Sequence, residues 1–182
     1  MIYEDLIIAG FGGQGVIFSG KLLARAGLRN GLEVTYFPSY GAEMRGGTAN
    51  CTVIVSDHMI PSPIATNPAH VIIMSQPAWE KFLPRVKDRG DVLINSSLVR
   101  PTSTHNHVRV VKVPANEIAE SLGEPRVANM VAMGAWATMT SVVPVPALLQ
   151  SLEDMLTGPK VRLLTLNQEA LREGARCVHR AR

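Results

Sequence analysis

The chain has 182 residues, 46% of them hydrophobic, so it is long enough to bury the core of one ordinary domain. Its 18 Lys and Arg residues against 15 Asp and Glu residues give a net charge of only +3, which excludes the strongly basic surface of a nucleic-acid-binding protein. The two cysteines, Cys51 and Cys177, lie far apart, so we expect neither a disulfide framework nor a metal cluster, as is typical of a reduced cytoplasmic protein. The N-terminus is acidic and enters a strand at once, which predicts no signal peptide.

Apolar runs and glycine turns predict strands and helices in alternation along the first two thirds of the chain. Strands are expected at residues 6–9, 34–37, 51–56, 71–74, 91–95 and 108–113. Helices are expected at residues 16–28, at 76–86 with a bend or an end at Pro84, and at 116–122, 127–143, 145–156 and 167–178. This order indicates an α/β fold, with residues 1–182 forming a single Rossmann-like domain. We expect a mostly parallel sheet flanked by helices, and a helical C-terminal third.

Two parts of this pattern lead to more specific expectations. The first strand, first helix and second strand are typical of a βαβ unit, so we expect the two strands to form a parallel pair. No clear helix separates the second strand from the third, so the third strand is expected to run antiparallel or to lie at an edge. The helix at 127–143 is apolar on nearly every side, and either another chain or the monomer itself must cover it. Its polar residues and the prolines that follow it make a buried soluble helix a better interpretation than a membrane span.

A glycine turn follows the first strand and precedes the first helix. Gly10, Gly12 and Gly15 have the spacing G-x-G-x-x-G, which lets a backbone approach a pyrophosphate at a helix N-terminus. Dinucleotide-binding proteins also carry an acidic residue at the end of the second strand, and residues 37–40 contain none. The pattern therefore counts against a nicotinamide or flavin cofactor, and it leaves a general anion site or a purely structural turn.

A second glycine-rich segment, residues 39–47, follows the second strand and contains a hydroxyl, a phenol, a carboxylate and a guanidinium. In an α/β sheet we expect it to lie beside the first turn, in the crevice where such sheets bind ligands. Arg45 suits a carboxylate or a phosphate, and the alternative is a pair with Glu43 that only orders the loop. No complete catalytic set is recognisable, since the histidines lack ligand spacing and there is neither a nucleophile elbow nor a Walker lysine.

Two long stretches carry a family resemblance. They are GFGGQGVIFSGKLLARAG at residues 10–27 and PSYGAEMRGGTANCTVIVS at residues 38–56, with shorter matches at 60–63 and 129–135. Together they resemble the gamma subunit, or gamma domain, of the 2-oxoacid:ferredoxin oxidoreductases. This family decarboxylates a 2-oxoacid on thiamine diphosphate, passes electrons through iron–sulfur clusters to ferredoxin, and transfers the acyl group to coenzyme A. The chain has no ferredoxin-type cysteine run and no recognisable thiamine diphosphate motif. The resemblance therefore implies that partner subunits carry the thiamine diphosphate and the 4Fe–4S clusters.

The resemblance further implies that this chain is inactive alone and helps its partners to close the acyl-transfer site, where its glycine segments contact coenzyme A. No catalytic or metal-binding residue is assigned to it. The candidate cofactor-binding residues are Gly12, Gly13, Gln14, Gly15, Ser39, Tyr40, Glu43, Arg45, Gly46 and Gly47. The glycine stretches favour 2-oxoglutarate as the substrate, with pyruvate or 2-ketoisovalerate as the alternative. Three other interpretations stay open: the small subunit of an indolepyruvate:ferredoxin oxidoreductase, a non-catalytic assembly module, and a stand-alone dinucleotide-binding oxidoreductase.

Overall fold

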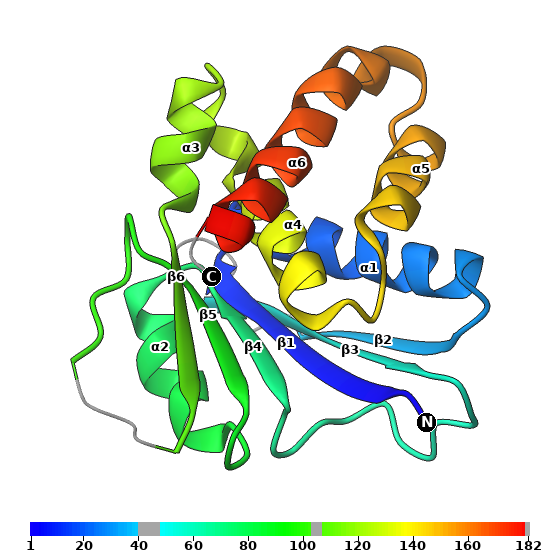
Figure 1. Ribbon diagram of the computed structural model, residues 1–182, viewed down its shortest axis with the longest axis vertical. Coiled ribbons are helices and arrows are strands. Elements are labelled where there is room, and N and C mark those ends of the chain that lie inside the picture. Colours follow the sequence, from blue (N-terminus) through cyan, green and yellow to red (C-terminus); the bar gives the residue numbers. More distant parts are fainter. Residues whose placement is uncertain (40–47, 103–106, 181–182) are drawn as a thin grey trace.

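The computed structural model is an α/β fold and describes residues 1–39, 48–102 and 107–180 (Figure 1). Residues 179 and 180 are described by their backbone alone. The strands are β1 (Tyr3–Phe11), β2 (Glu33–Ser39), β3 (Thr48–Ser56), β4 (His70–Ile73), β5 (Asp91–Asn95) and β6 (Arg109–Val113). The α-helices are α1 (Val16–Arg29), α2 (Gln76–Phe82), α3 (Ala115–Ser121), α4 (Ala128–Thr140), α5 (Val145–Met155) and α6 (Leu164–Arg180). Short 3-10 helices are η1 (Leu83–Arg85), η2 (Pro125–Val127) and η3 (Gly158–Leu163). Each strand and helix expected from the sequence is present close to its predicted position, and α2 ends just before Pro84 as expected.

The strands form one mixed sheet in the order β2-β3-β1-β4-β5-β6. β1, β4, β5 and β6 are parallel neighbours, whereas β3 runs antiparallel to both β1 and β2. The expected antiparallel third strand is confirmed, but the expected direct pairing of the first two strands is wrong. β3 lies between them and pairs with β1 from Tyr3↔Ser56 to Phe11↔Thr48. The crossover through α1 leaves one strand position open beside β1, and the chain fills this position when it returns antiparallel to β2.

Helices cover the two faces of the sheet unequally. α1, α3, α4, α5 and α6 form a layer on one face, and α2 lies on the opposite face against β1 and β4 (Figure 1). The alternation along β1 serves both layers, because Leu6 and Ile8 pack into the first core while Ile7 and Ala9 pack into the second. Among the described residues, no helix is long and apolar enough to cross a membrane.

α4 lies at the centre of the larger helical layer, in contact with α6, α3, α1 and α5. All of its residues are buried except two threonines near its end, so the monomer itself covers this apolar helix and no other chain is needed to do so. α6 approaches it to backbone contact. A Cβ added at Gly134 would overlap the carbonyl group of Leu171, and one added at Gly174 would overlap that of Val131. This contact makes α4 and α6 a rigid support for the residues at the start of α4.

Candidate functional site at the glycine turn

The glycine turn connects β1 to α1 at the carboxyl end of the parallel strands. Gly13 (φ 93°) and Gly15 (φ 74°) have left-handed backbone conformations that residues with side chains rarely adopt. Gly12 and Gly13 are exposed, and Gly15 is the N-cap of α1. No side chain caps α1, and its first turn contains no acidic residue, so the positive end of its dipole is not neutralised there.

Gln14 holds the turn onto the sheet. Its Oε1 accepts a hydrogen bond from the Phe11 N–H at 2.6 Å, and its Nε2 donates to the Met74 carbonyl oxygen at 3.0 Å. Its own N–H donates to the Phe11 carbonyl oxygen at 3.2 Å. Its side chain lies so close to Gly10 that a Cβ there would overlap Oε1. Gln14 therefore joins the ends of β1 and β4, and both ends of its side-chain amide are engaged within the chain.

Asn129, near the start of α4, contacts the turn from the helical layer. Its Nδ2 donates to the Gly15 carbonyl oxygen at 3.2 Å and to Oγ of Ser19 at 3.2 Å. The Ser19 hydroxyl in turn donates to the same carbonyl oxygen at 3.1 Å. Two segments that lie far apart in the sequence, residues 10–27 and 129–135, thus meet at the glycine turn.

A pocket of about 180 Å³ opens beside the turn. It is lined by Gly13, Gln14, Met74, Asn116, Pro125, Arg126 and Ala128. It lies where β1 continues into a helix on one face of the sheet and β4 continues into a helix on the other. Ligands of open α/β sheets bind at such a switch point, outside the carboxyl ends of the strands.

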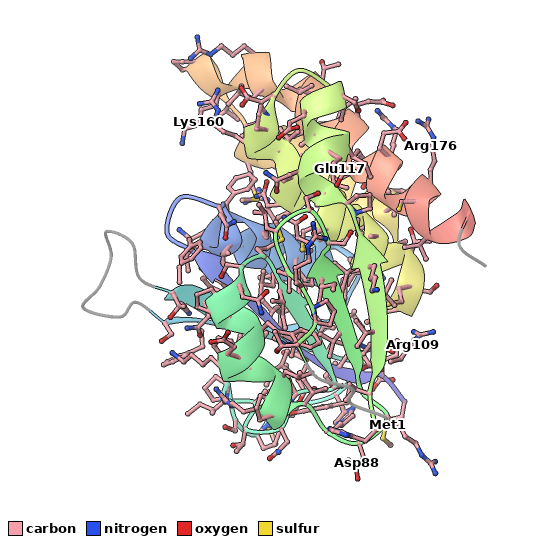
Figure 2. All side chains as sticks on the ribbon, turned by 90° about the vertical axis from the view of Figure 1, so that its left-hand side faces the viewer. Met1, Asp88, Arg109, Glu117, Lys160 and Arg176 are labelled. Atoms are coloured by element: carbon pink, nitrogen blue, oxygen red, sulfur yellow. The ribbon has the colours of Figure 1, made fainter. Side chains whose placement is uncertain are left out.

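A second pocket, of about 270 Å³, lies on the other side of Arg126, against the start of α1. Its lining is Gly15, Phe18, Glu124, Arg126, Val127, Asn129, Leu156, Lys160, Leu163 and Asn167. Lys160 comes from η3, at the end of the molecule opposite Met1 and Asp88 (Figure 2). The second pocket therefore combines apolar walls with Lys160, the paired side chains of Arg126 and Glu124, and the start of α1, which has no capping side chain.

Arg126 borders both pockets and is paired with Glu124. Its Nε lies 2.8 Å from Glu124 Oε1, and a second nitrogen lies 2.5 Å from Oε2. The side-chain and backbone hydrogen bonds that Glu124 accepts from Arg126 lower the pKa of the Glu124 carboxyl to about 2. The Arg126 side chain remains 76% exposed, so it can contact a ligand without losing its carboxylate partner.

The second glycine-rich segment is described only at its two ends. Ser39 pairs with Asn50, and Thr48 pairs with Phe11 at the start of the glycine turn, so the ends of this segment lie at the same edge of the sheet as the turn. This is the placement that the sequence predicts. The remaining candidates lie outside the described residues: Tyr40, Glu43, Arg45, Gly46 and Gly47.

Sequence reasoning did not assign a role to Arg126, Lys160 or Asn129. Arg126 and Lys160 occupy short 3-10 segments, which have no strong local pattern, and only the folded chain brings them to the turn. For Asn129 a signal was present, because a polar residue near the start of an otherwise apolar helix requires a specific partner once it is buried.

Cys51, one of the two cysteines, is a poor metal ligand in this fold. Cys51 is fully buried on β3, and burial raises the pKa of its thiol to about 12, so the thiolate that a metal requires is disfavoured. In the part of the chain that the structure describes, no three His, Cys, Asp or Glu side chains gather closely enough to hold a metal ion.

Comparison with known proteins identifies the family. The family model for pyruvate ferredoxin/flavodoxin oxidoreductase matches residues 5–177, nearly the whole chain. The chain belongs to this family. Among curated relatives, it is 33% identical over 186 residues to the 2-oxoglutarate synthase subunit KorC of Methanothermobacter thermautotrophicus, with 96% of this chain and 98% of KorC covered. It is 39% identical over 127 residues to the ketoisovalerate oxidoreductase subunit VorA of the same organism, with 70% of this chain and 26% of VorA covered.

Solved structures of the pyruvate ferredoxin/flavodoxin oxidoreductase family share the fold. The gamma subunit of a keto/oxoacid ferredoxin oxidoreductase from Geobacter sulfurreducens matches with a TM-score of 0.84 at 27% identity, covering 97% of this chain and 99% of that one. A 2-oxoglutarate:ferredoxin oxidoreductase from Magnetococcus marinus, solved with 2-oxoglutarate, coenzyme A and succinyl-CoA bound, matches with a TM-score of 0.90 at 25% identity. The match covers 99% of this chain but 32% of that chain. In this family the same fold therefore occurs both as a separate subunit and as a segment of a longer polypeptide.

Proposed function

We propose that this chain is the gamma subunit of a 2-oxoacid:ferredoxin oxidoreductase. In the overall reaction a 2-oxoacid and coenzyme A yield an acyl-CoA, carbon dioxide, a proton and a pair of electrons, which reduce ferredoxin. Partner subunits would bind thiamine diphosphate and the iron–sulfur clusters, because the sequence of this chain has neither a recognisable thiamine diphosphate motif nor a ferredoxin-type cysteine run. The match to a separate gamma subunit over nearly its full length supports this assignment over a stand-alone oxidoreductase.

We favour 2-oxoglutarate as the substrate of the complex. The match to KorC covers 98% of that subunit, whereas the match to VorA covers only 26% of a longer chain. A ketoisovalerate enzyme remains the second candidate, because the identity to VorA over the shared part is higher, at 39%. The indolepyruvate alternative has weaker support, since the IorB subunit of Archaeoglobus fulgidus is 27% identical.

This chain would contribute a binding surface for coenzyme A rather than a reacting group. The observation that carries this proposal is the position of Arg126 between two pockets that meet the glycine turn and the uncapped start of α1. Backbone N–H groups at a helix N-terminus bind phosphate oxygens, and an arginine beside them adds charge-assisted hydrogen bonds. In the second pocket, Lys160 adds another cation, and the apolar walls suit the uncharged part of a long ligand. The candidates at residues 39–47 remain sequence-based predictions for the same binding site.

The test is kinetic and uses the complete complex, assembled with its partner subunits. Arg126→Ala should raise the KM for coenzyme A about tenfold or more and change kcat little, because the side chain binds a part of the ligand that does not react. Arg109→Ala is the matched control, since Arg109 lies at the opposite end of the sheet and pairs with Asp91 at 2.7 Å (Figure 2). Arg45→Ala tests the second glycine-rich segment in the same assay.

Two results would contradict the proposal. An unchanged KM for coenzyme A in both Arg126→Ala and Arg45→Ala would leave the chain as an assembly module only. Purification of this chain without thiamine-binding and cluster-bearing companions, together with tight binding of a nicotinamide or flavin by the chain alone, would favour the stand-alone oxidoreductase instead.

A further inference from the structure

The peptide group between Gly15 and Val16 is where α1 begins, and its oxygen is held from three directions. The Gly15 carbonyl oxygen accepts from the Ser19 N–H at 2.9 Å, from the Ser19 hydroxyl at 3.1 Å and from Asn129 Nδ2 at 3.2 Å. We propose that Asn129 is a positioning residue that fixes the orientation of this peptide group and thereby aims the first N–H of α1 at the ligand. The inference rests on the proposed function of the turn as a binding site for coenzyme A.

The planarity of the peptide bond supplies the link between the carbonyl and the ligand. In a trans peptide the C=O of Gly15 and the N–H of Val16 point in opposite directions within one plane. A hydrogen bond that fixes the carbonyl oxygen on the helix side therefore fixes the N–H on the outer side, where α1 has no capping side chain. Asn129 acts on the N–H without touching the ligand.

Asn129 and Gly15 are also in close van der Waals contact. A Cβ added at Gly15 would overlap the Asn129 amide, so the amide occupies the space that any other residue at this position would need. Gly15 has φ 74°, which glycine adopts readily because it has no Cβ, and the same property lets glycine rotate its peptide planes more freely than other residues. A glycine that permits the turn would also loosen it, and the amide of Asn129 removes this freedom.

The support behind Asn129 is rigid. Asn129 is only 6% exposed and lies near the start of α4, whose backbone touches that of α6 at Gly134 and Gly174. Its amide also reaches Ser19 Oγ at 3.2 Å, inside the first turns of α1. α1 and α4 are thus connected at the turn by a polar contact that reaches the site, in addition to the apolar packing of their side chains.

If Asn129 had a purely structural role, its hydrogen bonds would stabilise the fold but would not determine the conformation of the turn. Asn129→Asp distinguishes the two roles, because it keeps the shape of the side chain but places a carboxylate oxygen against the Gly15 carbonyl oxygen. Thr138→Val is the matched control on the same helix. It removes a hydrogen bond from Thr138 Oγ1 to the Gly134 carbonyl oxygen (3.0 Å), which lies within α4 and away from the turn.

The first measurement uses the full chain alone and does not depend on the proposed function. We expect Asn129→Asp to shift the amide resonances of Gly13, Gly15 and Val16 and to accelerate hydrogen exchange at Val16, while Thr138→Val leaves these signals unchanged. Unchanged turn resonances in folded Asn129→Asp would overturn the positioning role.

The second measurement uses the assembled complex. Asn129→Asp should raise the KM for coenzyme A about tenfold, with kcat within about twofold of the wild type, as expected for the loss of one well-placed hydrogen bond. A shifted turn with an unchanged KM would support the positioning of the peptide group but contradict coenzyme A binding at the turn, so the two failures are distinguishable. If Asn129→Asp and Thr138→Val have equal effects on both measurements, Asn129 has only a structural role and the proposal is wrong.

If Asn129→Asp does not fold, Ser19→Ala provides the milder test. It removes one of the two side-chain donors to the Gly15 carbonyl oxygen, and we expect a smaller rise in the KM for coenzyme A, about threefold, with the same turn resonances shifted. No change in either readout would overturn the inference.

Discussion

The amino ends of the parallel strands carry a cluster of carboxylates with a histidine and an arginine between them, whereas the turn at the carboxyl ends is held by neutral amides. At the amino ends, His70 lies between Glu4 (2.8 Å) and Asp91 (3.4 Å), and Asp91 also pairs with Arg109 at 2.7 Å. At the carboxyl ends, the side chains of Gln14 and Asn129 hold the turn through backbone carbonyl and N–H groups.

We infer from this difference that the cluster at the amino ends stabilises the fold, whereas the turn at the carboxyl ends binds the ligand. At the amino ends the four side chains of the cluster contact one another, so their polar atoms are largely engaged within the chain. The amides at the carboxyl ends add no charge, so they leave the positive potential at the start of α1 available to an anion. The exposed Arg126 can also reach such an anion while it stays paired with Glu124. Substitutions at the two ends should therefore affect different measurements.

The largest effect is expected from Gly15→Ala at the carboxyl end. The added methyl group would be forced into a left-handed conformation and against the Asn129 amide, at a cost of about 2–3 kcal/mol in the free energy of unfolding. Gly31→Ala is the control, because Gly31 has a similar φ of 76° but open space around a Cβ. It should cost about 1 kcal/mol. Urea denaturation of both variants measures the difference between their free energies of unfolding. Equal losses would show that the Asn129 side chain moves away from the added methyl group at no energetic cost.

His70→Leu should have the next largest effect and is specific to the amino end. It removes a mostly buried partner from Glu4 and Asp91 and should lower the free energy of unfolding by about 1–2 kcal/mol. The KM for coenzyme A should not change, since the cluster lies at the far end of the sheet. His58→Leu is the matched control, because that histidine is exposed and its pair with Asp57 at 2.8 Å contributes little. A raised KM in His70→Leu would mean that the two ends are coupled.

The smallest effect is expected from Glu124→Gln, and it depends on pH. The pKa of Glu124 in the folded chain, about 2, lies below the ordinary value of 4.5, so its contribution to stability is complete above about pH 5 and is lost as the pH falls towards 2. Wild type and Glu124→Gln should therefore differ slightly at neutral pH and converge in acid. Thermal unfolding followed between pH 7 and pH 2 measures the convergence. A difference that grows in acid would contradict the assigned direction.

The sequence was sufficient to predict the elements of the fold but not all of their neighbours. The apolar runs at residues 71–74 and 92–94 predicted β4 and β5, because parallel strands that are covered on both faces are apolar over most of their length. The insertion of β3 between β1 and β2 was not predictable in the same way. Pairing of Phe11 with Thr48 is a contact between distant segments, and the glycine motif gives the direction of the crossover without giving the number of strand positions it spans.

The candidate site was predicted in part for a related reason. Glycines at residues 10–15 have a local signature, since left-handed conformations at Gly13 and Gly15 require them. Arg126 and Lys160 have no such signature, and their place beside the turn depends on how α4, α5 and α6 pack. The ligand roles of Gln14 and Ser39 remain predictions. The Gln14 side chain already makes hydrogen bonds to Phe11 and Met74, which leaves it fewer donors and acceptors for a ligand.

The backbone contact between α4 and α6 has one more consequence. Helices that interdigitate through side chains can settle in several neighbouring registers, because each ridge finds another groove one turn away. Here α4 and α6 each contain a single glycine, Gly134 and Gly174, and only one register places both glycines at the contact. Rotating α4 by a single residue, about 100°, would replace Gly134 with a side chain for which the backbone at Leu171 leaves no room. The two glycines therefore fix the alignment of α4 on α6, and in this alignment Asn129 contacts Gly15.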